Sequence, residues 1–165
     1  CARAMSSTFD DLDWNYSISD SREDFCNSKL FPNAKNHYNA TVDTFFDQVS
    51  ASELKKYSDV LLLGHDWSED EHRLLELLNI CQLNTFLPNG KQFPRIGVIG
   101  SRSKWQAFSK KALTHGLSQQ LLDDVICPIG LNIGAHSPEE IAVAVAGQIL
   151  SLQRNVSPSD KTWRD

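Results

Sequence analysis

The sequence has no hydrophobic run long enough to cross a membrane. Its longest apolar stretches, residues 60–64 and 141–150, fall short of the roughly 18 residues that a membrane-spanning helix needs. The first residues contain no apolar segment of the kind that a secretory signal requires. Both absences predict a protein of the cytoplasm that makes no contact with a membrane.

Cysteine is sparse, and its spacing excludes the common zinc and disulfide frameworks. The four cysteines lie far apart, none belongs to a CxxC pair, and none has a histidine at zinc-finger spacing. A chain of 165 residues can also bury a core without disulfide bonds. We therefore predict reduced thiols and no metal site.

Positive charge is scarce and is not clustered. The 16 Lys and Arg residues are outnumbered by 21 Asp and Glu residues, which gives a formal net charge of −5. The pairs Lys55-Lys56 and Lys110-Lys111 stand alone in the sequence. Because nucleic-acid binding is driven by clustered basic side chains, the sequence argues against nucleic acid as the main partner.

The sequence does contain enough apolar residues to form the core of one domain. Hydrophobic residues make up 41% of the chain, and its length fits a single domain. We predict that residues 1–152 form this domain and that residues 153–165 form a polar tail.

The chain alternates strand-like and helix-like segments. The predicted strands cover residues 14–20, 36–40, 59–64 and 95–100. The predicted helices cover residues 1–10, 42–49, 101–113, 117–122 and 141–152, and a further helix begins at Ser68 and includes the leucines of 74–78.

Two of these segments carry especially clear signals. Residues 59–64 form a continuous apolar run, which is typical of a strand buried on both faces in a parallel sheet. Ser137, Pro138 and Glu140 are typical of a helix start with a capping box, and Ser68 with Glu71 has the same spacing. The alternation of apolar strands with helices predicts an α/β fold: a doubly wound, Rossmann-like, mostly parallel sheet flanked by helices.

In such sheets ligands bind beyond the carboxyl ends of the strands, so the residues that follow each strand are the candidates. Asp20, with Arg22 beside it, follows the first predicted strand and could bind ribose hydroxyls, or it could be an ordinary turn carboxylate. His65 follows the apolar run and could contact a ligand or carry a proton, or it could bond only to the backbone.

The third candidate is an anion site at the start of a helix. Residues Gly100, Ser101, Arg102, Ser103 and Lys104 offer backbone N–H groups, two hydroxyls and two cations, although the spacing is not that of a Walker loop. The alternative is a helix cap with two surface cations. A fourth candidate is Gly130, where the backbone could turn tightly or approach a ligand closely. Nearby, Cys127 is more typical of a small buried apolar residue.

Several of these stretches together resemble the carboxy-terminal Rossmann domain of the XdhC/CoxI family of xanthine dehydrogenase accessory proteins. The matching segments are Asp20–Phe25 with Phe31–Ala34, Gly64–Asp66 with Asp70, Ile96–Lys104 (IGVIGSRSK) and Cys127–Ala146 (CPIGLNIGAHSPEEIAVAVA). The resemblance implies a nucleotide-binding fold that acts as a chaperone. Such a protein binds the molybdenum cofactor (molybdopterin), protects it during sulfuration by a cysteine desulfurase, and delivers it to a xanthine dehydrogenase-type molybdoenzyme.

The sequence also departs from that family pattern. The pattern includes a cysteine-bearing amino-terminal domain, then a first strand and a glycine-rich loop, whereas Cys1–Ala4 resembles the residues that follow that loop. We therefore expect a Rossmann-like domain without its first, central strand. Because exposed strand edges invite pairing, we expect the strands at 14–19 and 59–63 to close up directly, or a second copy to cover them in a homodimer.

Two other functions are compatible with the sequence. Asp20 also suits an NAD(P)-binding oxidoreductase-like domain, although the glycine loop of that class is not in the sequence. The third possibility is a ligand-free module that only dimerises or docks on a molybdoenzyme. The departure from the family pattern at the glycine-rich loop favours it.

Overall fold

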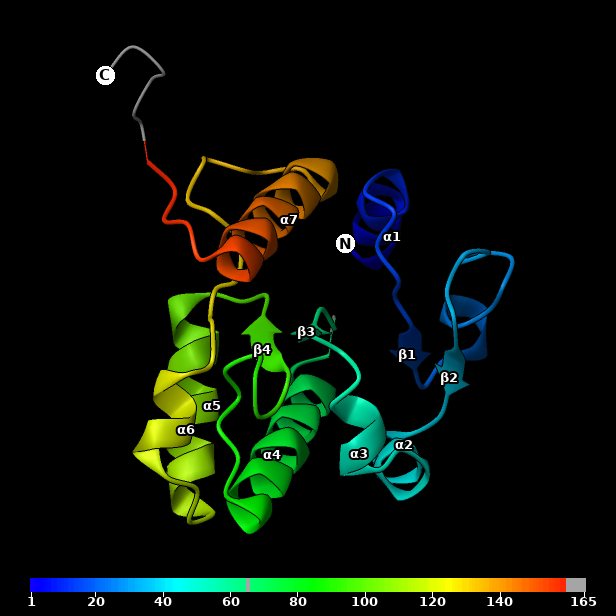
Figure 1. Cartoon of the computed structure of the whole chain (residues 1–165). Coiled ribbons are helices and arrows are strands. Elements are labelled where there is room, and N and C mark those ends of the chain that lie inside the picture. Colours follow the sequence, from blue (N-terminus) through cyan, green and yellow to red (C-terminus); the bar gives the residue numbers. More distant parts are fainter. Residues whose placement is uncertain (65, 160–165) are drawn as a thin grey trace.

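The computed structural model describes residues 1–64 and 66–159, and its first half is a run of short elements (Figure 1). Thr41 and Ser50 cap two of the helices, because each hydroxyl accepts a hydrogen bond from the backbone N–H three residues later. The elements are α1 (Ala2–Asp11), β1 (Ile18–Asp20), the 3₁₀ helix η1 (Glu23–Phe25), β2 (His37–Asn39), α2 (Val42–Gln48) and α3 (Ala51–Leu54).

The second half contains longer helices and the larger part of the core. Ser137 and Glu140 form the predicted capping box at the start of the last helix, with Pro138 in its first turn. Ser101 caps the helix that it was predicted to begin. The elements are β3 (Asp59–Leu62), α4 (Trp67–Asn84), β4 (Arg95–Val98), α5 (Arg102–Thr114), α6 (Gln119–Asp123) and α7 (Pro138–Arg154).

Two local predictions were wrong. Ser68 does not cap α4: the Asp66 carboxylate accepts hydrogen bonds from the N–H groups of Ser68 and Glu69, and the helix begins at Trp67. The first strand is also shorter than predicted, since residues 14–17 lie outside β1. Trp14 instead packs its ring against Phe9 of α1, with the ring centres 5.5 Å apart. Its apolar character reflects helix packing rather than membership of a strand.

The strands form two separate parallel pairs rather than the single sheet that we expected. In one pair β1 lies beside β2, with Ile18 opposite His37, and in the other β3 lies beside β4, with Asp59 opposite Arg95. An isolated bridge between Gly97 and Ile126 extends the second pair. In the described part of the chain β1 does not pair with β3, so the expected direct closure of these strands was wrong.

Helices cover both faces of the β3–β4 pair, which gives three layers. Side chains alternate between the faces of a strand. Val60 and Leu62 point to the core formed with α4, α5 and α6, whereas Leu61 and Leu63 point to the core formed with α1 and α7. The arrangement is that of an α/β domain with short parallel strands flanked by helices (Figure 1). None of the helices within the described ranges is long and apolar enough to span a membrane.

Candidate functional site

A cleft of about 1020 Å³ separates the two strand pairs. Its walls include β1 on one side and β3 on the other, and the first residues of α1 also line it. One hydrogen bond crosses between the two sides at each end. The hydroxyls of Ser17 and Tyr57 lie 2.8 Å apart near the amino ends of β1 and β3, and the Ser21 hydroxyl donates to Glu69 at 2.7 Å near their carboxyl ends. These contacts show that β1 and β3 run in the same direction.

The cleft leaves an apolar strand partly uncovered. The sequence predicted that the run at 59–64 would be buried on both faces, and Leu62 is buried, with 4% of its surface exposed. Val60, Leu61 and Leu63 are only half-buried, and all three line the cleft. The prediction of full burial was therefore wrong, because one edge of β3 faces the cleft rather than another strand.

Asp20 and Arg22 lie together at the carboxyl end of β1. The Arg22 side chain donates to both carboxylate oxygens of Asp20, through Nε at 2.9 Å and Nη2 at 2.8 Å, and its guanidinium lies 4.0 Å from the centre of the Phe25 ring. Burial acts to raise the pKa of Asp20, but the hydrogen bonds and charge of Arg22 outweigh it and lower that pKa. The carboxylate therefore stays ionised at the mouth of the cleft.

A second group of charges faces this pair from the first turns of α4. Arg73 makes an ion pair of 3.1 Å with Glu69, one helical turn earlier, and Glu69 also accepts the hydrogen bond from Ser21. Both side chains line the cleft. Neither residue was predicted from the sequence, although the spacing of Glu69 and Arg73 was a visible signal for a charged pair on one helix face.

Lys104 is buried in an ion pair instead of facing solvent. Its ammonium group donates to the Asp70 carboxylate at 2.7 Å and to the Ile99 carbonyl at 3.0 Å, and the two side chains expose only 4% and 1% of their surface. The same carboxylate accepts the N–H of Gly64 at 3.2 Å. The pair thus ties α4 and α5 to the carboxyl ends of β3 and β4, and the charge of Lys104 is neutralised there.

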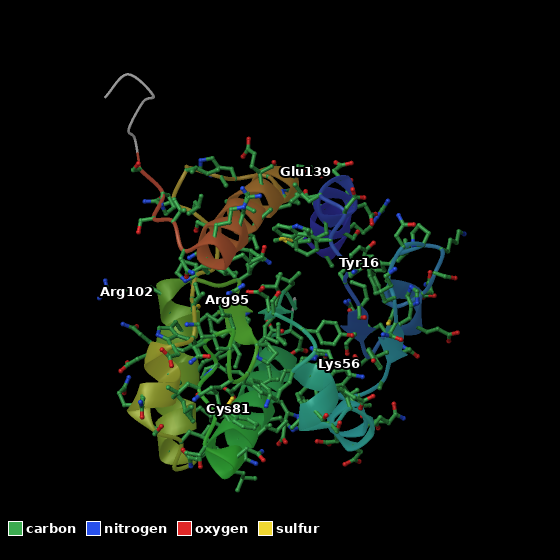
Figure 2. All side chains as sticks on the ribbon, in the orientation of Figure 1. Tyr16, Lys56, Cys81, Arg95, Arg102 and Glu139 are labelled. Carbon is green, nitrogen blue, oxygen red and sulfur yellow. The ribbon has the colours of Figure 1, made fainter. Side chains whose placement is uncertain are left out.

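The rest of the predicted anion site lies away from the cleft. Ser101, Arg102 and Ser103 are exposed at the start of α5, and the Ser101 hydroxyl accepts the N–H of Lys104 at 3.2 Å. Figure 2 shows Arg102 at the far left of the view, across β4 from Tyr16, which lines the cleft. Gly100 packs against the Lys104 side chain, where an added Cβ would lie 2.7 Å from its Cδ. The structure therefore divides the predicted anion site: Lys104 is buried beside Asp70, and residues 101–103 are exposed at the start of α5.

Gly130, another of the predicted site residues, does not add to the cleft or to the start of α5. His65 lies outside the described residues. Gly130 has a φ of +120° and rests against α7, where its N–H donates to the Gln148 side chain at 2.6 Å. This φ lies in the region that glycine adopts without strain, and it brings the chain close to Ala144 and Val145 of α7.

The cysteines that the structure buries have weakly acidic thiols. Burial raises the pKa of Cys81 to about 12 and also raises the pKa of Cys26. Burial raises the pKa of Cys127 as well, although the nearby charge of Lys104 partly opposes the change. Cys127 packs against the main core, as expected of a small apolar residue. None of these three thiols has the lowered pKa that marks a nucleophile.

Comparison with known proteins gives three findings that agree with one another. The sequence model of the XdhC Rossmann domain matches residues 1–149. The chain is 25% identical over 153 residues to the Escherichia coli protein YqeB, and 26% identical over 151 residues to a Bacillus subtilis protein named as a probable xanthine dehydrogenase subunit. These alignments cover 93% and 89% of this chain but only 26% and 38% of the two relatives, so the chain spans a minor part of their length.

A solved structure has the same fold. The crystal structure of a protein described as a xanthine dehydrogenase from Bacillus halodurans superposes with a TM-score of 0.71 at 20% sequence identity. The match covers 98% of this chain and 42% of that one. At this identity the likeness establishes the arrangement of the elements and nothing about the chemistry.

Proposed function

Because the chain belongs to the XdhC Rossmann domain family, we propose that it acts as a molybdenum-cofactor chaperone. In this proposal it binds molybdopterin, protects it while a cysteine desulfurase delivers sulfur, and passes it to a molybdoenzyme of the xanthine dehydrogenase type. The name of the Bacillus subtilis relative, a probable xanthine dehydrogenase subunit, supports this choice of partner. The single observation that carries the proposal is the match of the family model to residues 1–149.

The cleft offers groups that fit a pterin. A pterin is a flat ring with hydrogen-bonding edges, and the half-buried apolar residues Val60, Leu61 and Leu63 would cover its faces. The ionised carboxylate of Asp20 would accept hydrogen bonds from the N–H edge of the ring. Arg22, with 40% of its side chain exposed, would lie beside it at the mouth. The bound cofactor is the cargo of this chain, and the redox chemistry of its metal belongs to the enzyme that receives it.

The phosphate of the cofactor needs a second group of residues. Ser101, Arg102 and Ser103 stay our predicted phosphate site, because they are exposed at the amino end of α5 and follow the carboxyl end of the neighbouring strand β4. Lys104 would contribute indirectly, because its pair with Asp70 fixes the start of α5 next to β3.

Binding measurements with two variants test both halves of the proposed site. Molybdenum cofactor released from a purified molybdoenzyme is titrated anaerobically into the protein, beside a pterin that lacks phosphate. We expect Asp20→Asn to weaken both ligands by tenfold or more, the size expected when one charged hydrogen bond is lost. We expect Arg102→Ala to weaken only the phosphate-bearing ligand.

The exposed Lys110→Ala serves as a matched control, because it removes a positive charge from the exposed surface of α5. If neither ligand binds the unaltered protein, the proposal is wrong.

The position of Asp20 also favours a second function, that of an NAD(P)-binding oxidoreductase-like domain. A carboxylate at the end of the second strand of a dinucleotide-binding unit binds the ribose of NAD, and Asp20 ends β1 at the mouth of the cleft. The same titration with NAD and NADP decides between the two functions. Binding of a nicotinamide nucleotide, with no binding of the pterin, would favour an oxidoreductase-like domain.

A further inference from the structure

Two turns at the carboxyl ends of β3 and β4 are built in the same way. Each strand is followed by a glycine, Gly64 after β3 and Gly100 after β4, and each glycine is covered by a charged side chain of the next helix. A Cβ on Gly64 would collide with the Asp70 carboxylate, and a Cβ on Gly100 would lie 2.7 Å from Cδ of Lys104. Both turns are therefore fitted closely to these two side chains.

The two covering side chains bond to each other and to both turns. The Lys104 ammonium group donates to one Asp70 oxygen at 2.7 Å and to the carbonyl of Ile99, the neighbour of Gly100, at 3.0 Å. The other Asp70 oxygen accepts the N–H of Gly64 at 3.2 Å. A continuous chain of hydrogen bonds thus joins the backbone of one turn to the backbone of the other.

This link is enclosed and leaves little freedom to its members. Lys104 and Asp70 expose only 4% and 1% of their side chains. In the part of the chain that the structure describes, no buried side-chain nitrogen or oxygen lacks a hydrogen-bond partner. Separation of two buried charges is costly, because neither finds water in exchange. The pair therefore allows only small changes in the distance between the two turns.

The same link reaches the first turn of α5, which carries the predicted phosphate site. The backbone N–H of Lys104 donates to the Ser101 hydroxyl at 3.2 Å. Because the Lys104 side chain is buried, a ligand in solvent would meet the exposed residues 101–103 instead. A ligand that shifts this turn also shifts Lys104, and the ion pair passes the shift to Asp70.

We propose that Asp70 is a positioning residue for the phosphate site, because it couples the start of α5 to the turn at Gly64. An anion bound at residues 101–103 then changes the surroundings of Gly64, and a change at Gly64 alters the affinity for the anion, since coupling between binding equilibria is reciprocal. Asp70 itself does not touch the ligand. The inference rests on the proposed function, because it takes residues 101–103 as the phosphate site.

A second ion pair between the same two helices provides a matched comparison. Lys111 of α5 and Glu71 of α4 lie 3.2 Å apart, and their side chains expose 49% and 23% of their surface. Lys111 lies about two turns further along α5 than Lys104. An exposed pair constrains its helices only weakly. This pair should therefore not transmit a change between the two turns.

The test follows the backbone amides of the protein by heteronuclear NMR while inorganic phosphate is titrated into it. The amides of Arg102 and Ser103 report on the phosphate site. The amide of Gly64 reports on the other turn, because its hydrogen bond to Asp70 makes its signal sensitive to any shift of that carboxylate. We expect all three signals to follow one binding curve in the unaltered protein.

Two double variants, neither of which changes the net charge, separate the two ion pairs. Lys104→Met with Asp70→Asn removes the buried pair. It should weaken phosphate binding about fivefold and abolish the response of Gly64, an effect of the size measured for residues between coupled sites. Lys111→Met with Glu71→Gln removes the exposed pair and should leave both the affinity and the response unchanged.

A single variant keeps the test decisive if the first double variant does not fold. Gly64→Ala adds a methyl group that collides with the Asp70 carboxylate, while Lys104 and residues 101–103 keep their own side chains. It should weaken phosphate binding about threefold, although the substituted residue lies outside the phosphate site. A purely structural role for the pair would lower stability and leave this affinity unchanged.

The possible results distinguish this inference from the proposed function. If Arg102 and Ser103 do not respond to phosphate, the phosphate site is wrong and the coupling is wrong with it. If they respond but Gly64 does not, only the coupling is wrong. The coupling is also overturned if Gly64→Ala or the buried-pair variant binds phosphate with unaltered affinity. An equal loss of affinity in the exposed-pair variant would overturn it too, because any link between the helices would then suffice.

Discussion

The two strand pairs of this domain are built from the same kind of unit but differ sharply in how well they are covered. β3 and β4 lie between two layers of helices, and Ile96 and Val98 are completely buried. Asp59 and Arg95 join these strands further through two hydrogen bonds of 2.7 Å. β1 and β2 have three residues each, and none of these six residues is fully buried.

The difference shows that the α/β pattern alone does not determine how firmly each part of a sheet is held. Local stability follows the apolar surface that an element buries. The β3–β4 pair has helices on both faces, so more of its apolar surface is buried. The β1–β2 pair has less cover: Tyr38 of β2 packs against Phe45 of α2, and the rest of the pair is partly exposed. Three measurements examine this contrast, beginning with the largest expected effect.

Lys104→Met should be the most damaging of these changes, because it leaves the Asp70 carboxylate buried without its cation. Removal of one partner from a buried ion pair costs about 3–5 kcal/mol in the free energy of unfolding. Urea denaturation followed by circular dichroism measures this loss. The double variant Lys104→Met with Asp70→Asn should recover much of it, because the amide still accepts the N–H of Gly64 and carries no charge. A loss below about 1 kcal/mol for the single variant would contradict a structural role for the pair.

Truncation of one residue in each pair compares the two halves directly. Leu62→Ala in β3 should lower the free energy of unfolding by about 2–5 kcal/mol, because Leu62 is buried in the main core. Ile18→Ala in β1 should cost less than about 1.5 kcal/mol, because Ile18 is only half-buried. Chemical denaturation of both variants under one set of conditions gives the comparison. Equal losses would mean that β1 is as firmly packed as β3.

The smallest expected effect concerns the pH dependence of the β1 end. The pKa of Asp20 is lowered in the folded protein, so its pair with Arg22 stabilises the fold above the unfolded pKa. That contribution is lost as the pH falls through the lowered pKa. Because both side chains are partly exposed, it should be about 1 kcal/mol or less. Asp20→Asn should flatten the stability curve below about pH 4 and leave its shape above pH 6 unchanged. If Asp20→Asn left the pH dependence of the free energy of unfolding unchanged, the Asp20–Arg22 pair would contribute nothing to stability.

Most elements of the fold could be predicted from the sequence because their signals are local. The capping box of Ser137 and Glu140, the cap at Ser101 and the apolar runs of β3 and β4 all involve residues close together in the chain. One error, at the start of α4, arose where two local signals competed. Asp66 and Ser68 are both good caps, and the aspartate, which accepts two backbone N–H groups, fixed the start of α4.

The candidate site was less predictable because its geometry depends on contacts between distant residues. Lys104 was expected to bind an anion, and nothing in its neighbourhood in the sequence shows that Asp70, 34 residues earlier, neutralises it. Likewise, Asp20 ends one strand and Arg102 follows another, and the distance between them depends on the order of the strands in space, which the sequence does not show. The cleft was not predicted, because we expected the strands at 14–19 and 59–63 to close up directly, whereas contacts between distant residues hold them apart.

The hydrogen bonds Ser17–Tyr57 and Ser21–Glu69 have a consequence for the energetics of any molecule that enters the cleft. They hold the two walls in place at both ends before a ligand arrives. A ligand of the right width therefore meets a preorganised site and spends little of its binding energy on ordering the protein. A ligand of the wrong width must break one of these bonds. The width between the two walls is therefore fixed by the Ser17–Tyr57 and Ser21–Glu69 hydrogen bonds.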